Sequence, residues 1–132
     1  MLRGERDQNG FRWWCQWVFD VCQRGPGRKL VCIPEIWEVC NPDSIPHEFA
    51  LLSQAGRELG VELVLDTQRP ELVNASITGA ATELVCFKLL SPDALNAVKK
   101  LGADRDAVAA LPLGTFVGYN RLSAGMLTGK VF

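Results

Sequence analysis

Two apolar segments of this chain end in polar residues of a kind that can orient water. Lys29–Ile33 is followed by Pro34 and Glu35, and Val61–Leu65 is followed three residues later by Gln68. A carboxylate can accept a proton from water, and an amide can hold the water in place. If the two side chains meet, the combination suggests a crevice that hydrolyses a nucleotide.

The spacing of apolar residues predicts the elements that position these side chains. Helices are expected where apolar residues recur every three to four positions, and strands where short apolar runs end at turn residues. The helices are predicted at 11–24, 46–59, 70–77, 94–101 and 104–110, and the strands at 29–33, 61–65 and 83–89. A terminal hairpin is predicted within 113–132, from strands at 114–120 and 126–132.

Strands that alternate with helical crossovers are expected to run parallel, with helices covering the sheet. The predicted fold is therefore an α/β three-layer sandwich with a mainly parallel sheet, forming a single partial domain over residues 1–132. Open sheets of this kind bind ligands beyond the carboxyl ends of their strands. Glu35 and Gln68 both follow such ends, so neighbouring strands would bring them into one crevice.

Composition narrows the class of protein. Hydrophobic residues make up 48% of the 132 residues and charged residues 22%, which is ordinary for a globular domain and argues against disorder. The net charge of −1 gives no overall field that would attract nucleic acid. No apolar run approaches the roughly 20 residues that span a bilayer, and no signal peptide is evident, so a cytoplasmic protein is expected.

The five cysteines form no CxxC pair, and the chain has a single histidine. A zinc site made of Cys32, Cys40 and His47 is one interpretation of these residues. Buried free thiols in a reducing compartment are the simpler interpretation, because several of the cysteines lie within apolar runs.

The order of these motifs resembles the FtsK–HerA branch of P-loop ATPases. The resemblance is carried by the apolar strand that ends at Glu35, the helix that ends in GRELG, the segment VELVLDTQRP and its continuation ITGAATELVCFKLLSPDAL. It covers roughly residues 28–101. The branch contains DNA pumps, conjugation ATPases and packaging motors, so the resemblance implies a RecA-like core that binds ATP and Mg²⁺.

The resemblance also implies roles for individual residues. Glu35 matches the carboxylate that activates water, and Gln68 matches the sensor of the γ-phosphate. Arg57 matches the place of an arginine finger that acts on a neighbouring subunit. Thr67 and Arg69, on either side of Gln68, are the implied nucleotide-binding residues.

Two departures from the family pattern limit these expectations. Pro34 stands where the family has the aspartate that holds Mg²⁺, and the chain contains no phosphate loop of the form G-x-x-x-x-G-K-S/T. The nearest match, Gly125–Val131, is one residue short and falls in the predicted hairpin. We expect the second half of an ATPase core that does not hydrolyse ATP alone. It would act as a homo-oligomer or with a partner chain that carries the phosphate loop, with DNA as a possible substrate.

An alternative is a non-catalytic α/β module that binds another protein. Trp13, Trp14 and Trp17 could stack on a nucleic-acid strand, but their spacing in a helix favours a buried face or a face that meets a partner.

Overall fold

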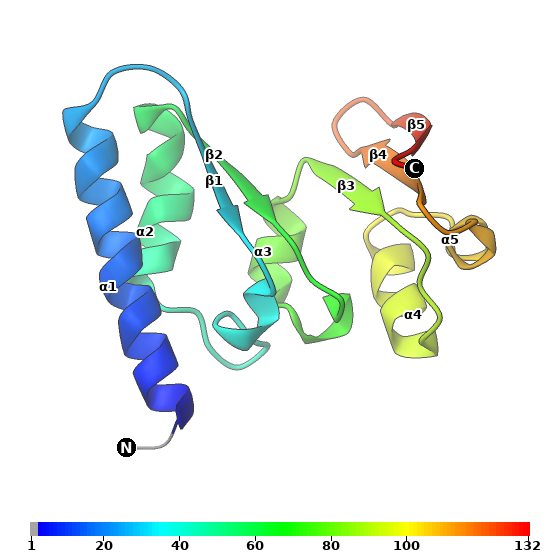
Figure 1. Ribbon diagram of the computed structural model, residues 1–132, viewed down its shortest axis with the longest axis horizontal. Helices are drawn as coiled ribbons and strands as arrows, with labels where there is room; N and C mark the ends of the chain where they lie inside the picture. The colour runs from blue at the N-terminus through cyan, green and yellow to red at the C-terminus, as the bar shows by residue number, and fades with distance from the viewer. Residues whose placement is uncertain (1–2) are drawn as a thin grey trace. The chain divides into compact units, whose positions relative to one another are not determined.

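The computed structural model describes residues 3–132, with side chains from residue 8 onward. It contains two compact units, which divide between Gln68 and Arg69 (Figure 1). None of the helices in residues 3–132 is both long and apolar enough to cross a membrane.

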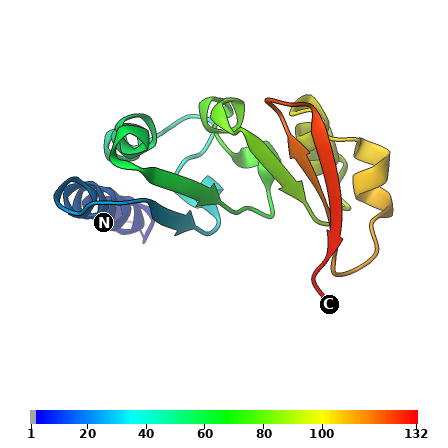
Figure 2. The same cartoon turned by 90° about the horizontal axis from the view of Figure 1, so that it is seen from above.

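The first unit places two helices against a pair of strands (Figures 1 and 2). Its elements are α1 (Arg3–Arg24), β1 (Lys29–Ile33), the 3₁₀ turn η1 (Ile36–Glu38), α2 (His47–Ala55), the 3₁₀ turn η2 (Gly56–Leu59) and β2 (Val61–Leu65). The helices α1 and α2 lie side by side (Figure 1). The most deeply buried side chains of this unit include Phe49 and Leu52 on α2 and Ile36 in η1.

The strands β1 and β2 are parallel neighbours, as predicted, with Lys29 opposite Val61 and Ile33 opposite Leu65. Side chains alternate between the two faces of such a pair. One face carries the buried Val31 and Ile33. On the other face Leu30 and Val64 are 64% and 50% exposed. We call the face that carries Leu30, Cys32, Glu62 and Val64 the open face of the strand pair.

The amino ends of the two strands are joined to the end of α1. The Lys29 ammonium donates hydrogen bonds to the carbonyls of Cys22, Gly25 and Leu59, so it caps both α1 and η2. Gly60 has φ of 74°, and a Cβ there would lie 3.0 Å from the carbonyl oxygen of Gly27. Glycine is therefore required at this crossing.

The second unit is a three-stranded antiparallel sheet with helices on one face (Figure 2). Its elements are the 3₁₀ turn η3 (Pro70–Leu72), α3 (Ala75–Ala80), β3 (Glu83–Cys86), α4 (Pro92–Lys100), α5 (Arg105–Ala110), β4 (Thr115–Asn120) and β5 (Gly125–Lys130). The strand order is β3-β4-β5.

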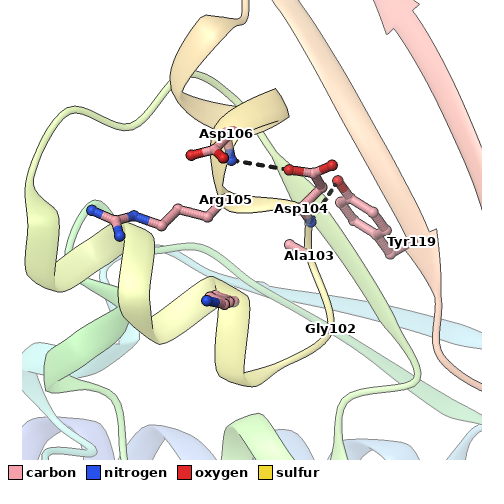
Figure 3. Close-up of a pocket in the computed structure, with 7 residues that line it drawn as sticks. Gly102, Ala103, Asp104, Arg105, Asp106 and Tyr119 are labelled. Carbon is pink, nitrogen blue, oxygen red and sulfur yellow. Dashed lines mark hydrogen bonds between the residues drawn. The ribbon is translucent and has the colours of Figure 1, made fainter.

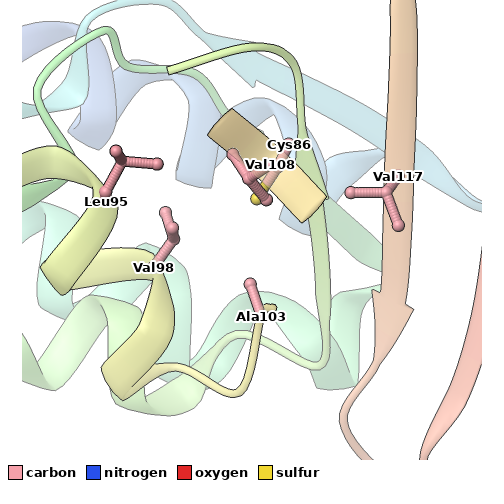
Figure 4. Close-up of a cluster of buried hydrophobic side chains, with 6 residues drawn as sticks. All are labelled: Cys86, Leu95, Val98, Ala103, Val108 and Val117. Atoms are coloured by element: carbon pink, nitrogen blue, oxygen red, sulfur yellow. The ribbon is translucent and has the colours of Figure 1, made fainter. Parts of the chain in front are cut away.

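The core of the second unit lies between α4, α5 and this sheet. Figure 4 shows its six buried side chains, which come from two strands, two helices and the loop between the helices: Cys86, Leu95, Val98, Ala103, Val108 and Val117. On the opposite face of the sheet, Phe116 packs against Phe87 with ring centroids 5.8 Å apart. The Phe116 ring also lies across Gly129, where a Cβ would come within 2.3 Å of the ring.

The α/β class and the terminal hairpin are confirmed, but the parallel part of the sheet is smaller than predicted. Among the strands that the structure describes, only β1 and β2 pair in parallel, whereas β3 pairs antiparallel with β4. Two successive helices connect β3 to β4, and they return the chain to the end of β3 at which it left. A single crossover helix would have favoured a parallel strand. The prediction of one domain over residues 1–132 stays a prediction.

Several element boundaries also differ from the predictions. The helix α1 begins at Arg3 and not at residue 11, because residues 3–10 are polar or glycine and so give no apolar period that would predict a helix. The strand β3 ends at Cys86 and not at Leu89, because its ladder with β4 ends at the pair Cys86 and Val117. The helix predicted at 70–77 is divided into η3 and α3.

Candidate functional site

The turn after β1 holds Glu35 in a strained backbone conformation. Its φ of 47° and ψ of 49° lie in the left-handed region, which costs a residue with a Cβ about 1–3 kcal/mol. Hydrogen bonds to Asp66, which follows β2, fix the turn on both sides. The Asp66 N–H donates to the Ile33 carbonyl at 3.0 Å, and the Ile36 N–H donates to the Asp66 carbonyl at 3.0 Å.

The Glu35 carboxylate is held through one of its two oxygens. Oε2 accepts a hydrogen bond of 2.9 Å from the Trp37 indole Nε1–H and one of 3.2 Å from the Gln68 backbone N–H. The other oxygen, Oε1, accepts no hydrogen bond from the described side chains or backbone. The carboxylate is therefore oriented while one oxygen stays available to a donor such as water.

The structure thus brings the Glu35 side chain to Gln68 across neighbouring parallel strands. The contact is made by the Gln68 backbone, and the residue itself is exposed. Thr67 is half-buried beside it. Arg69 is the first residue of the second unit, where its carbonyl accepts a hydrogen bond from the Leu72 N–H.

Arg57 does not join this group. It lies in η2, which precedes β2, whereas Glu35 and Gln68 follow the carboxyl ends of their strands. Since each strand has five residues and rises about 3.3 Å per residue, roughly 16 Å of strand separates the two ends. The exposed Arg57 could act only on something outside this strand pair.

A hollow of about 360 Å³ adjoins Glu35 in the first unit. Glu35 and Glu38 line it, together with Pro34, Cys32 and aromatic residues of α1. Phe11 and Trp14 form its aromatic wall, with stacked rings whose centroids are 6.0 Å apart. The hollow is large enough for several water molecules next to a carboxylate.

The residues present do not fit a magnesium site. Pro34, at the position of the family's aspartate, is exposed and has no side-chain oxygen. Within residues 3–132, no group of three histidine, cysteine, aspartate or glutamate side chains is placed to hold a metal ion. The sequence likewise contains no phosphate loop for ATP. The chemistry that these residues offer is therefore the orientation of water.

The thiols do not form a site either. Cys15 and Cys40 are fully buried, and burial raises the pKa of each thiol to about 12. They remain protonated and inert at neutral pH. Of the residues in the zinc interpretation, Cys32 and His47 are exposed while Cys40 is buried, and no described metal-binding group includes them.

A second hollow, of about 440 Å³, lies in the second unit (Figure 3). Its polar groups are already engaged in local structure. The Asp104 carboxylate accepts hydrogen bonds from the N–H groups of Asp106 and Ala107 and so caps α5. The Tyr119 hydroxyl accepts a hydrogen bond from the Asp104 N–H at 3.0 Å. With Lys99 and Arg105 alongside the acids, the hollow has no preference for one sign of charge.

Sequence reasoning missed Trp37. An indole can only donate a hydrogen bond. The sequence does contain a signal for this contact, because Trp37 follows the candidate catalytic Glu35 by two residues. The left-handed turn at Glu35, which brings the two side chains together, has no such signal, because the residue is not glycine.

No protein-family model matches the sequence, and no curated protein matches it. Solved structures do match. The genome packaging NTPase B204 from Sulfolobus turreted icosahedral virus 2, in complex with ATPγS, has a TM-score of 0.71 and 20% sequence identity over 80% of this chain and 53% of that chain. The same protein in complex with AMPPCP gives the same values. The fold of this chain is therefore similar to that of about half of this NTPase.

B204, the DNA-packaging ATPase from Sulfolobus turreted icosahedral virus, also matches with a TM-score of 0.71 and 20% identity over 80% of this chain. This chain spans about half the length of these structures. The comparisons confirm the predicted resemblance at the level of the fold. The roles predicted for Glu35, Gln68, Arg57, Thr67 and Arg69 stay predictions.

Proposed function

We propose that this chain supplies the water-orienting half of an ATP-hydrolysing site in a motor that moves or packages DNA. The observation that supports the proposal is the hydrogen bond from the Gln68 N–H to the Glu35 carboxylate, at the tips of neighbouring parallel strands. The fold shared with a DNA-packaging ATPase supports the same assignment. Open sheets of this class place their chemistry at these strand ends.

In this proposal Glu35 orients and polarises the attacking water, and Gln68 senses the γ-phosphate. Thr67 and Arg69 contact the nucleotide, and Arg57 serves a neighbouring subunit from the opposite end of the strands. The motor is a ring of subunits, expected to be a hexamer, and acts in the cytoplasm.

The phosphate loop and the magnesium ligand come from elsewhere in the assembly, either a partner chain or a further segment of a longer protein. The open face of the strand pair is consistent with this, because large apolar side chains on a sheet face normally have a cover.

The first test is an assay of phosphate release by the purified chain with ATP and Mg²⁺. We expect no turnover above background, because loss of a single stabilising donor from an oxyanion hole already costs about 2.7–4 kcal/mol. Mg²⁺-dependent turnover by the chain alone would contradict the need for a partner.

The second test begins with the DNA that precedes the codon for Met1, where an in-frame G-x-x-x-x-G-K-S/T would identify the missing half. The joined or co-expressed protein should hydrolyse ATP. Glu35→Gln should reduce kcat by about 10²–10³-fold. Glu38→Gln is the matched control, since Glu38 lines the same hollow, and it should retain activity. Equal activity of both variants would overturn the role of Glu35.

A non-catalytic interaction module is the second candidate function. The exposed stripe on α1 favours it, since Trp13, Trp17 and Val21 are 68%, 51% and 49% exposed. These residues are spaced four apart and so share one helix face. If no phosphate loop is encoded upstream and ATP gives no thermal protection of the protein, the module is the better assignment.

A further inference from the structure

We propose that Trp37 is a positioning residue for Glu35. Its indole N–H holds the carboxylate oxygen Oε2, so that Oε1 points a free lone pair at water. The inference deepens the proposed function and rests on it, because water orientation by Glu35 is the chemistry concerned.

The backbone of Glu35 contributes rigidity to this arrangement. The two hydrogen bonds to Asp66 fix the turn on both sides, and Ile36, immediately after Glu35, is only 1% exposed. The Glu38 N–H also donates to the Glu35 carbonyl at 3.0 Å. What remains free is rotation about the side-chain bonds of Glu35. The two hydrogen bonds to Oε2 restrict that rotation.

An indole is suited to this task for two reasons. It donates a hydrogen bond but accepts none, so it cannot exchange roles with the carboxylate. It is also neutral, whereas a lysine or arginine in the same place would form an ion pair and offset the negative charge that polarises water. Trp37 is half-buried in η1, where the adjacent buried Ile36 anchors the turn.

The Gln68 N–H is the second donor to the same oxygen, at 3.2 Å against 2.9 Å for the indole. Since only proline at position 68 would remove the backbone donor, and proline would also restrict the turn, Trp37 is the group through which the orientation is best changed. Removing it should leave one longer hydrogen bond and a carboxylate that samples several rotamers.

The test uses nuclear magnetic resonance of the isolated chain without nucleotide. Glu35→Ala removes the acceptor but keeps a Cβ, and hence the backbone strain. The exchange of the Trp37 indole proton with solvent should then become about tenfold faster, as expected for loss of a hydrogen bond to a charged group. Glu38→Ala, in the same turn, is the matched control and should leave this exchange unchanged.

The reciprocal variant is Trp37→Phe, which keeps an aromatic ring without the donor. In the unmodified chain, the three-bond couplings of the Glu35 side chain should have the values of a single rotamer. In Trp37→Phe they should become averages over several rotamers. Trp17→Phe, on the exposed stripe of α1, should leave them unchanged. The β1 and β2 amide resonances provide the check that each variant is folded.

Unchanged indole exchange in Glu35→Ala, or a single Glu35 rotamer in Trp37→Phe, would overturn the positioning role. These measurements do not depend on ATP. If they give the expected changes but the completed assembly shows no dependence on Glu35 for hydrolysis, the proposed function fails while the positioning by Trp37 stands.

Discussion

The two sheets of this molecule use the polar residues at their strand ends in different ways. After β1, the Glu35 carboxylate is held through one oxygen while the other remains open. After β4, the polar groups are engaged with backbone. Arg121 donates to the carbonyls of Thr78 and Ala81, each at 2.7 Å, and the Asn120 side chain accepts from the N–H groups of Leu122 and Ser123.

This difference distinguishes groups that build the fold from groups that are available for chemistry. A charged group whose partners are backbone carbonyls stabilises a turn or helix end, and its removal costs stability. A carboxylate that is oriented but retains an open oxygen, on a strained backbone, contributes little to folding. The parallel strand pair is therefore where we place the site.

The largest expected contrast is in thiol reactivity. Cys32 lies on the open face of the first sheet and is exposed, whereas Cys86 is buried against helices in the second, where burial raises its pKa to about 11. In the native protein at neutral pH, iodoacetamide should modify Cys32 at least about a hundredfold faster than Cys86. Mass spectrometry of peptides after timed labelling measures both rates. Comparable rates would mean that the open face is covered in solution.

Removal of Arg121 should give the largest loss of stability. Arg121→Met deletes the hydrogen bonds to the end of α3, and we expect the free energy of unfolding to fall by about 2 kcal/mol. Arg105→Met, a half-buried arginine of the same unit, is the control and should cost less. Denaturant titration followed by circular dichroism measures both. Similar losses would show that the contacts of Arg121 are not structural.

Glu35→Gly should raise stability, because glycine adopts the left-handed backbone without strain. The expected gain is about 1 kcal/mol in the free energy of unfolding. Ala124, with φ of 53° in the hairpin turn, is the only other non-glycine residue with positive φ among the described residues, and Ala124→Gly should give a similar gain. Only Glu35→Gly should impair hydrolysis in a completed assembly. A net loss of stability in Glu35→Gly would mean that its side-chain hydrogen bonds outweigh the strain.

The smallest effect is expected at the ion pair between α1 and α2. Arg12 lies 2.9 Å from Glu48, and the hydrogen bond from its guanidinium holds the pKa of the Glu48 carboxyl below its ordinary value. Its stabilisation is present above that ordinary pKa and is lost as the pH falls through the lowered one. Arg12→Ala should flatten the acid side of a plot of unfolding midpoint against pH. Gln16→Ala, on the same helix, should leave the slope unchanged.

Much of the first unit could be predicted because parallel pairing follows from simple rules. A strand, a helix and a second strand place their carboxyl ends together, which brings Glu35 to Gln68. The buried side of α1 was harder to predict. The apolar residues at helical spacing include Val18 and Cys22, which are buried, but also Trp17 and Val21, which are exposed. Small side chains let α1 and α2 approach closely. A pattern of hydrophobicity alone does not show which positions require a small side chain.

The contact between Trp37 and Glu35 could not be predicted for a related reason. It depends on the backbone angles of one turn and on one side-chain rotamer, which neither periodicity nor motif spacing encodes. The antiparallel pairing of β3 depends likewise on how two short helices turn the chain, and their directions are set by packing.

The Phe116 ring that lies across Gly129 has a consequence for how the hairpin can vary. Since any Cβ at position 129 would overlap that ring, the two positions are expected to change together. In a library of double variants, alanine at 129 should survive selection mainly when a smaller residue replaces the phenylalanine. The effect of the double variant could then not be obtained by adding the effects of the two single variants. A scan of single substitutions would therefore underestimate the range of sequences that this hairpin tolerates.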